Sequence, residues 1–122
     1  MPPRAQTVVI IEDEPVSADA LSLVVRDWGA EVAVGTSAKA VADQLGPKVR
    51  EVGWIITDFN LGAGPNGVAG IGDITSAAPG AKVLVLSGSM HGQAEASAAR
   101  AGYSYMQKPA RAESIVSWLE RA

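Results

Sequence analysis

The fold is decided by one stretch, Val52-Gly53-Trp54-Ile55-Ile56-Thr57-Asp58-Phe59-Asn60-Leu61. This apolar run, rich in β-branched and aromatic residues, ends in a single aspartate and is followed by a glycine-rich loop from Gly62 to Gly67. A short run of this kind is typical of a strand that is buried on both faces of a sheet. The carboxylate of Asp58 then stands where the strand leaves the sheet, the edge at which open α/β sheets bind their ligands.

Outward from this strand, four more short apolar segments predict strands, and helical patterns separate them. The predicted strands cover residues 7–11, 31–35, 52–58, 82–86 and 103–107. The predicted helices begin at Pro15, after the N-cap Ser37, near Val68, at Gln93 and at Arg111. Buried strands that alternate with helices through short connections predict an α/β fold with a parallel sheet and helices on both faces. We expect one domain over residues 1–122.

The helix after Asp58 is the weakest of the five. Val68, Ile71 and Ile74 have helical spacing, but Gly70 and Gly72 lie among them. Each glycine costs about 1 kcal/mol relative to alanine in a helix. We therefore expect this helix to be short, to begin late or to be mobile.

The apolar spacing also predicts which helix faces turn inward. For the first helix the predicted inner stripe is Val16, Ala20, Leu23, Val24 and Trp28. For the last helix it is Ala112, Ile115, Val116 and Leu119, with Trp118 off the stripe, where it covers a neighbour or contacts a partner. Trp28 and Trp54 are expected in or near the core, and the alanine-rich helix from Gln93 to Ala101 is expected to pack closely but weakly.

Composition excludes several classes of protein. The chain has 122 residues, 48% of them hydrophobic and 19% charged, and a net charge of −3, which gives no electrostatic case for binding nucleic acid. The absence of cysteine excludes thiol catalysis and thiolate metal sites, and the single histidine, His91, excludes a histidine-rich metal centre. There is no apolar run of about 20 residues to span a membrane and no signal-peptide pattern. We expect an intracellular, cytoplasmic protein, and Met1 so close to the first strand favours one that stands alone.

Polar residues follow four of the predicted strands: Glu12 and Asp13, Asp58, Ser87, and Lys108. Three carboxylates in one cleft repel, since two unit charges about 4 Å apart cost on the order of 4 kcal/mol at an effective dielectric near 20. A hard divalent cation removes this cost, and Mg²⁺ prefers carboxylates, waters and phosphate oxygens. A lysine and a serine add further donors, so the set suits an aspartate that attacks phosphorus and then carries the phosphoryl group.

With these residues in register, the sequence resembles the receiver domain of two-component response regulators, the family typified by the stand-alone chemotaxis regulator. The resemblance runs from Thr7 to about Leu119. It rests on Glu12-Asp13, Asp58, Ser87, Tyr105 and Lys108-Pro109, with 45 residues from Asp13 to Asp58, 29 on to Ser87 and 21 on to Lys108. It implies a doubly wound, flavodoxin-like sheet with strand order 2-1-3-4-5.

The resemblance also implies a role for each site residue. Asp58 is the implied phosphoacceptor. Asp13, Asp58 and the backbone carbonyl of Asn60 are the implied Mg²⁺ ligands, and Glu12 acts through a bound water. Ser87 and Lys108 are implied to bind phosphoryl oxygens. Tyr105 is the implied aromatic switch, which moves inward when Ser87 shifts toward the phosphate.

The implied partners are those of a phosphorelay. A histidine kinase or a phosphotransfer protein supplies the phosphoryl group, and an unknown output protein reads the result. The output surface is expected on the face made by helix 91–101, strand 103–107 and helix 111–121. The chain departs from the family pattern in having Glu-Asp in place of Asp-Asp, no Met-Pro after Leu61, and a small neutral Ser89 where access of the hydrolytic water is tuned.

Two other interpretations stay open. One is a phosphatase with an aspartyl-phosphate intermediate, which needs a general acid near the nucleophile, but the residue two after Asp58 is Asn60, which is no acid. The other is an interaction module that keeps the fold without being phosphorylated. We expect no enzyme beyond catalysis of its own phosphorylation and dephosphorylation, and a flavin site suggested by fold analogy alone has no support.

Overall fold

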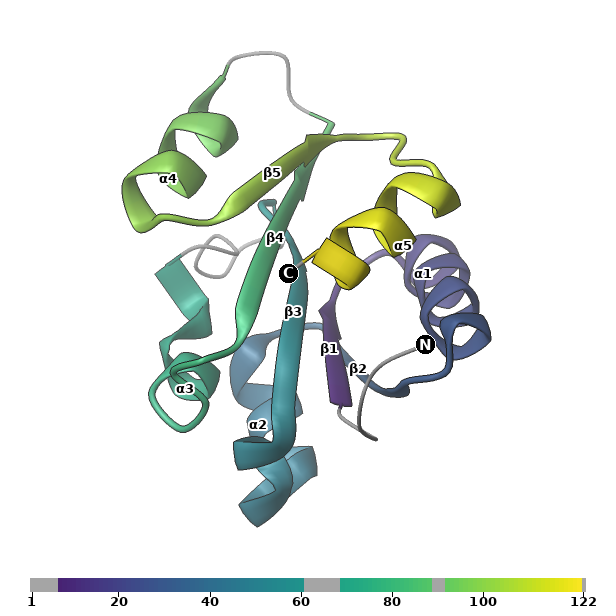
Figure 1. The fold of residues 1–122 in the computed structure, drawn as a ribbon. Coiled ribbons are helices and arrows are strands. Elements are labelled where there is room, and N and C mark those ends of the chain that lie inside the picture. Colours follow the sequence, from purple (N-terminus) through teal and green to yellow (C-terminus); the bar gives the residue numbers. More distant parts are fainter. Residues whose placement is uncertain (1–6, 61–68, 89–91, 122) are drawn as a thin grey trace.

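The computed structural model describes residues 7–60, 69–88 and 92–121. Its centre is a five-stranded sheet in the order β2-β1-β3-β4-β5, and all four strand pairs are parallel (Figure 1). The strands are β1 Thr7–Ile11, β2 Glu31–Gly35, β3 Val52–Asp58, β4 Lys82–Ser87 and β5 Ser104–Gln107. The predicted fold class and strand order are confirmed. Only two strand ends differ, since β4 extends to Ser87 and β5 begins at Ser104.

Helices cover both faces of the sheet (Figure 1). They are α1 Pro15–Trp28, α2 Ala38–Leu45, α3 Gly72–Thr75, α4 Gln93–Ala101 and α5 Ala112–Arg121, with short 3₁₀ helices η1 Gly46–Glu51 and η2 Ala69–Ile71. Helices α1 and α5 bury their residues in one core cluster, and α2, α3 and α4 bury theirs in the other. Among the residues described, no helix combines the length and the hydropathy that a membrane crossing requires.

Helix α3 is as short and as late as its glycines predict. It has four residues and follows the 3₁₀ turn η2. Ile71 and Ile74 are still buried, at 2% and 0% exposure, so they cover the sheet although little regular helix carries them. Val68, the first residue of the predicted stripe, lies outside the described residues.

The predicted inner stripe of α1 is confirmed for Val24 and Trp28, which lie against or in the core, and is wrong for its other three residues. Val16 is 74% exposed and Leu23 is 68% exposed, and Ala20 is exposed as well. The residues that face the sheet are Ala18, Ser22, Val25 and Trp28. Ser22 is tolerated inside because its hydroxyl donates to the carbonyl of Ala18 at 2.8 Å, which satisfies the buried polar group. Trp28 and Trp54 are core residues as predicted and meet edge to face, with ring centroids 5.2 Å apart.

Trp118 is also placed differently from the prediction. It is 6% exposed and packs into the core with Ile115 and Leu119, whereas Ala112 is exposed. The inner stripe of α5 is therefore shifted toward its largest side chain, which buries more apolar area than alanine does. Trp118 is not a surface residue for partner binding.

The two leucines at Leu119 and Leu23 give a matched test of these faces, since they sit in helices and differ in exposure, 1% against 68%. We expect Leu119→Ala to lower the free energy of unfolding by about 2–5 kcal/mol, because it leaves a cavity. We expect Leu23→Ala to change it by no more than about 0.5 kcal/mol. Urea denaturation followed by circular dichroism measures both. Equal losses would contradict the assignment of the inner face of α1.

Candidate functional site

The carboxyl ends of the strands hold the predicted site residues at one edge of the sheet. Hydrogen bonds continue past three of the strand ends: Glu12 N–H donates to the Gly35 carbonyl at 3.0 Å, Phe59 N–H to that of Leu86 at 2.9 Å, and Lys108 N–H to that of Ser87 at 2.9 Å. The backbone at this edge is therefore held in register beyond the strands.

Side-chain alternation brings Glu12 and Asp58 to the same face. Asp58 is next in the β3 row of Trp54 and Ile56, which belong to the cluster covered by α1 and α5. Glu12 extends the β1 row of Val8 and Ile10 in the same way. Both carboxylates are buried, with 3% exposure for Glu12 and 9% for Asp58.

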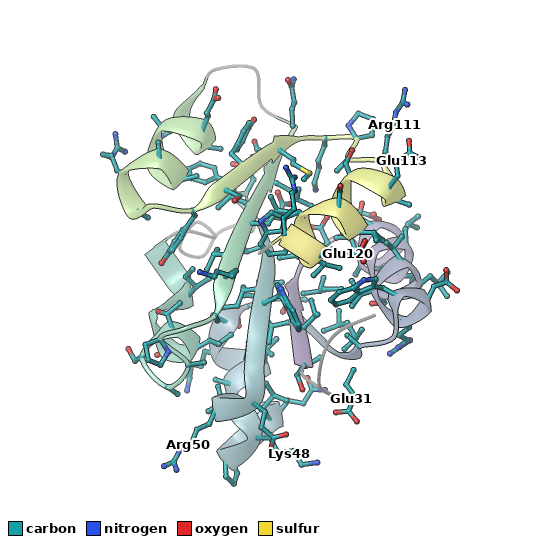
Figure 2. The ribbon with its side chains drawn as sticks, viewed as in Figure 1. Glu31, Lys48, Arg50, Arg111, Glu113 and Glu120 are labelled. Carbon is teal, nitrogen blue, oxygen red and sulfur yellow. The ribbon has the colours of Figure 1, made fainter. Side chains whose placement is uncertain are left out.

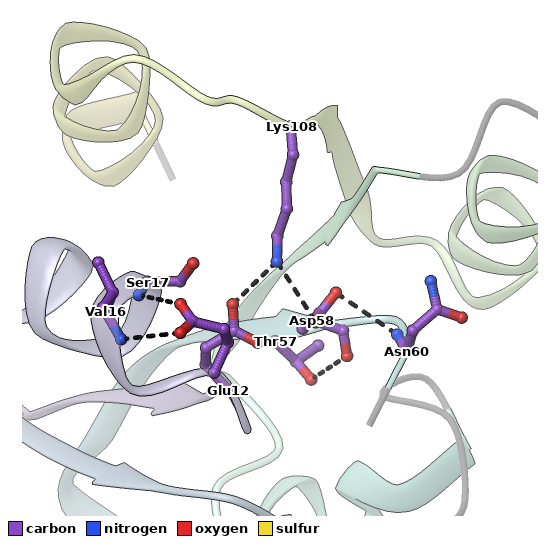
Figure 3. A network of polar contacts seen from close by, with 8 residues as sticks. Glu12, Val16, Ser17, Thr57, Asp58, Asn60 and Lys108 are labelled. Atoms are coloured by element: carbon purple, nitrogen blue, oxygen red, sulfur yellow. Dashed lines mark hydrogen bonds and ion pairs between the residues drawn. The ribbon is translucent and has the colours of Figure 1, made fainter. Parts of the chain in front are cut away.

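Lys108 joins the two buried acids. Its Nζ lies 2.8 Å from Glu12 Oε1 and 3.3 Å from Asp58 Oδ2 (Figure 3). Asp58 Oδ1 accepts the backbone N–H of Asn60 at 3.4 Å. Each oxygen of Asp58 thus has one donor, and the lysine bridges strands β1, β3 and β5, whose site residues lie as far as 96 positions apart in the chain.

A third carboxylate completes an acidic group. Glu12, Asp13 and Asp58 each offer one oxygen, and these three oxygens lie within 4.8 Å of one another. Asp13 is exposed, so the group is open to solvent on its side. Glu12 Oε2 is buried and has no hydrogen-bond partner among the residues described. A buried oxygen without a donor, in a set made only of carboxylates, fits a hard divalent cation such as Mg²⁺.

Burial and neighbouring charges shift the pKa of two of these groups. The pKa of Glu12 is raised, mainly because burial disfavours its carboxylate, and the nearby Asp58 raises it further against the opposing effect of Lys108. For Lys108, burial acts to lower the pKa, but the hydrogen bond to Glu12 and the charge of Asp58 outweigh it, so the pKa is raised. The lysine is therefore held as an ammonium, whereas the charged form of Glu12 is disfavoured.

The family model described as "Response regulator receiver domain" matches residues 8–120. The chain belongs to the response regulator receiver family. Among curated protein sequences, no match was found.

Solved receiver domains share the fold of this chain. The response regulator receiver domain protein from Clostridium thermocellum is 19% identical, with a TM-score of 0.78 over 95% of this chain and 92% of its own. A CheY-like receiver domain protein from Methanospirillum hungatei is 16% identical, with a TM-score of 0.80 over 97% and 93%. The signal receiver domain of an HD domain-containing protein from Pseudomonas fluorescens is 21% identical, with a TM-score of 0.81 over 98% and 94%. At these identities the likeness shows a shared fold.

Ser87 and Tyr105 of this receiver domain lie on the opposite face of the sheet from Asp58. Ser87 is fully buried and is next in the β4 row of Val83 and Val85, which face α2, α3 and α4. Tyr105 pairs with Val85 and is half-buried against the same cluster. The two residues predicted to form the switch thus share a face. Their roles, and the roles of Ser89 and the loop 62–67 outside the described residues, stay predictions.

The sequence did not reveal how the receiver's acids are held. The direct contact of Lys108 with Glu12 depends on side-chain reach across two strand ends, which no spacing encodes. The N-cap role of Glu14 also went unnoticed, although Pro15 at the first helical position marks residue 14 as the cap.

In the metal-free protein, Glu12→Gln is expected to gain stability relative to the wild type as the pH rises above 4.5. Because the folded-state pKa of Glu12 lies above its ordinary value of 4.5, the contribution of Glu12 to stability is fully present below pH 4.5 and is lost as the pH rises through the folded pKa. Glutamine does not titrate, so the free energy of unfolding of the variant should rise relative to that of the wild type over this pH window and then level off. Urea unfolding at several pH values without Mg²⁺ measures it.

Glu31→Gln is the matched control, because Glu31 is exposed and its side chain points away from the ribbon (Figure 2). Its effect should be small at every pH. A difference in stability between Glu12→Gln and the wild type that is the same at pH 4 and pH 7 would contradict the raised pKa.

Proposed function

We propose that this receiver domain accepts a phosphoryl group on Asp58 from a histidine kinase or a phosphotransfer protein, with Mg²⁺ as cofactor, and thereby switches the binding of an output protein. The observation that carries the proposal is the position of the Asp58 carboxylate. It lies 3.3 Å from the ammonium of Lys108, and together with Glu12 and Asp13 it offers three oxygens that lie within 4.8 Å of one another.

The charges of the site support a cation. Three carboxylates against one ammonium leave an excess of negative charge, which a divalent ion neutralises. Asp13, Asp58 and the Asn60 carbonyl are the proposed ligands, and Glu12 is proposed to act through a water. When bound, Mg²⁺ supplies charge neutralisation for an incoming phosphoryl group.

The side chains of the receiver have separate tasks in this scheme. A carboxylate oxygen of Asp58 attacks phosphorus while the bond from phosphorus to the imidazole nitrogen of the donor histidine breaks and the imidazole leaves. The Asn60 N–H holds the other oxygen of Asp58 in place. Lys108 binds the transferred oxygens. Glu12 Oε1, 2.8 Å from Lys108 Nζ, keeps the ammonium next to Asp58. The exposure of Asp13, together with a Lys108 side chain that is 29% exposed, leaves room for a phosphodonor.

The face that carries Ser87 and Tyr105 suits a switch. An acyl phosphate adds about −1.5 to −2 charges as other phosphorylations do, and we propose that Ser87 moves toward it. Helix α4 fills this side of the core with Ala94 and Ala98 alone, so few apolar contacts oppose a change in packing around Tyr105. Such a change shifts the populations of two alternative packings of α4, β5 and α5. The face that these three elements form is the proposed output surface. The buried Trp118 takes no part in it.

Incubation with Mg²⁺ and acetyl phosphate should add one phosphoryl mass to the protein, detected by intact-mass spectrometry. Asp58→Asn should abolish the gain, because the amide is no nucleophile at this position. Chelation with EDTA should suppress it. An equal gain in Asp58→Asn would assign the phosphoryl group elsewhere. No gain in the wild type would leave the unphosphorylated interaction module, and sustained turnover of phosphomonoesters would indicate a phosphatase.

Ser87→Ala separates phosphorylation from switching. We expect the variant to gain the phosphoryl mass but to lose most of the phosphorylation-dependent amide shifts in β5 and α4. The variant lacks the hydroxyl that is proposed to move toward the phosphoryl group. Two-dimensional NMR with and without beryllofluoride measures this. Ser104→Ala, at an exposed position of β5, is the control and should keep the wild-type shifts. Undiminished shifts in Ser87→Ala would remove Ser87 from the switch.

A further inference from the structure

Glu14 lies next to the acidic group but points its carboxylate elsewhere. Its two oxygens accept backbone hydrogen bonds from α1, with Oε1 3.3 Å from Val16 N and Oε2 2.7 Å from Ser17 N. Its backbone carbonyl accepts the N–H of Ala18 at 3.0 Å. Because Pro15 has no N–H, the donors of Val16 and Ser17 are those that the first turn leaves to be capped. Glu14 therefore ties the end of the acidic loop firmly to α1.

Asp13 has no such support of its own. It is exposed, and within the described residues its side chain makes no hydrogen bond or ion pair. Its backbone is instead anchored on both sides: Glu12 N–H binds the Gly35 carbonyl at 3.0 Å, and Glu14 binds the first turn of α1. The position of the Asp13 backbone, from which the carboxylate extends, is thus set by its two neighbours.

We propose that Glu14 is a positioning residue for the metal site, which holds Asp13 in place for the cation by capping α1. This inference rests on the proposed function, since it requires a cation at the acidic group. Without the cap, the backbone between Asp13 and Pro15 gains conformations that binding must remove, and that ordering costs free energy. Loss of partners that orient metal ligands typically weakens metal binding about 10–100-fold.

Glu14 is not itself a ligand. Both of its oxygens accept hydrogen bonds from the first turn of α1. Among the described residues, the carboxylates that lie close enough to share a cation are those of Glu12, Asp13 and Asp58. The remaining alternative is that the charge of Glu14 attracts the cation through space, without any effect on geometry.

The pair Glu14→Ala and Glu14→Ser separates these two effects. Both variants remove the charge and shorten the side chain, but serine is a preferred N-cap and alanine is not. Mg²⁺ affinity is measured by NMR titration of the backbone amides, and folding is checked by urea unfolding. Ser37→Ala is the matched control, since Ser37 caps α2 through the N–H of Ala40 at 3.1 Å and that helix holds no residue of the acidic group.

We expect Glu14→Ala to bind Mg²⁺ about tenfold more weakly than the wild type, and Glu14→Ser to stay within about threefold. Ser37→Ala should unfold at lower urea with wild-type Mg²⁺ affinity. Equal weakening in Glu14→Ala and Glu14→Ser would assign the effect to charge and overturn the proposal, as would wild-type affinity in Glu14→Ala. A wild type that binds no Mg²⁺ would instead refute the proposed function, on which this inference stands.

Discussion

The structure depends on one ion-pair arrangement, the ammonium of Lys108 between the carboxylates of Glu12 and Asp58. Buried charges are costly unless they are paired, and here each of them comes from a different strand end. Glu12 follows β1, Asp58 ends β3 and Lys108 follows β5, so these charges are matched only when the sheet has its full strand order. These ion pairs therefore form only when β1, β3 and β5 have all taken their places in the sheet.

The same arrangement leaves the site incompletely satisfied. In the part of the chain that the structure describes, Glu12 Oε2 has no hydrogen-bond partner, and the pKa of this carboxyl is raised mainly by its burial. An apolar residue at position 12 would avoid both costs, so the acid is poorly explained by folding stability alone. Local inconsistency of this kind is expected where a protein keeps a group for function. In the function proposed here, the cation offsets the excess negative charge.

The sequence predicted the sheet and its edge well, because continuous apolar runs such as residues 52–58 mark buried parallel strands and end where polar residues begin. It predicted the helix faces less well. On α1, the stripe of Val16 and Leu23 and the stripe of Ala18, Ser22 and Val25 both have helical spacing, and hydropathy favours the wrong one. The choice depends on how closely α1 approaches the sheet, and on a serine hydroxyl that finds its acceptor within the helix. The capping bonds of Glu14 likewise depend on side-chain geometry.

The two faces of the sheet divide the proposed chemistry from the proposed response. Glu12 and Asp58 extend rows that face α1 and α5, whereas Ser87 and Tyr105 belong to the face covered by α2, α3 and α4. A signal from Asp58 must therefore cross the sheet, and the strand ends are where it can. The Ser87 carbonyl accepts the N–H of Lys108 at 2.9 Å, so the backbone that carries the serine is bonded to the residue that carries the ammonium. In the proposed function, a change at Asp58 that moves Lys108 would also move the backbone of Ser87, and with it the alanine-lined packing around Tyr105.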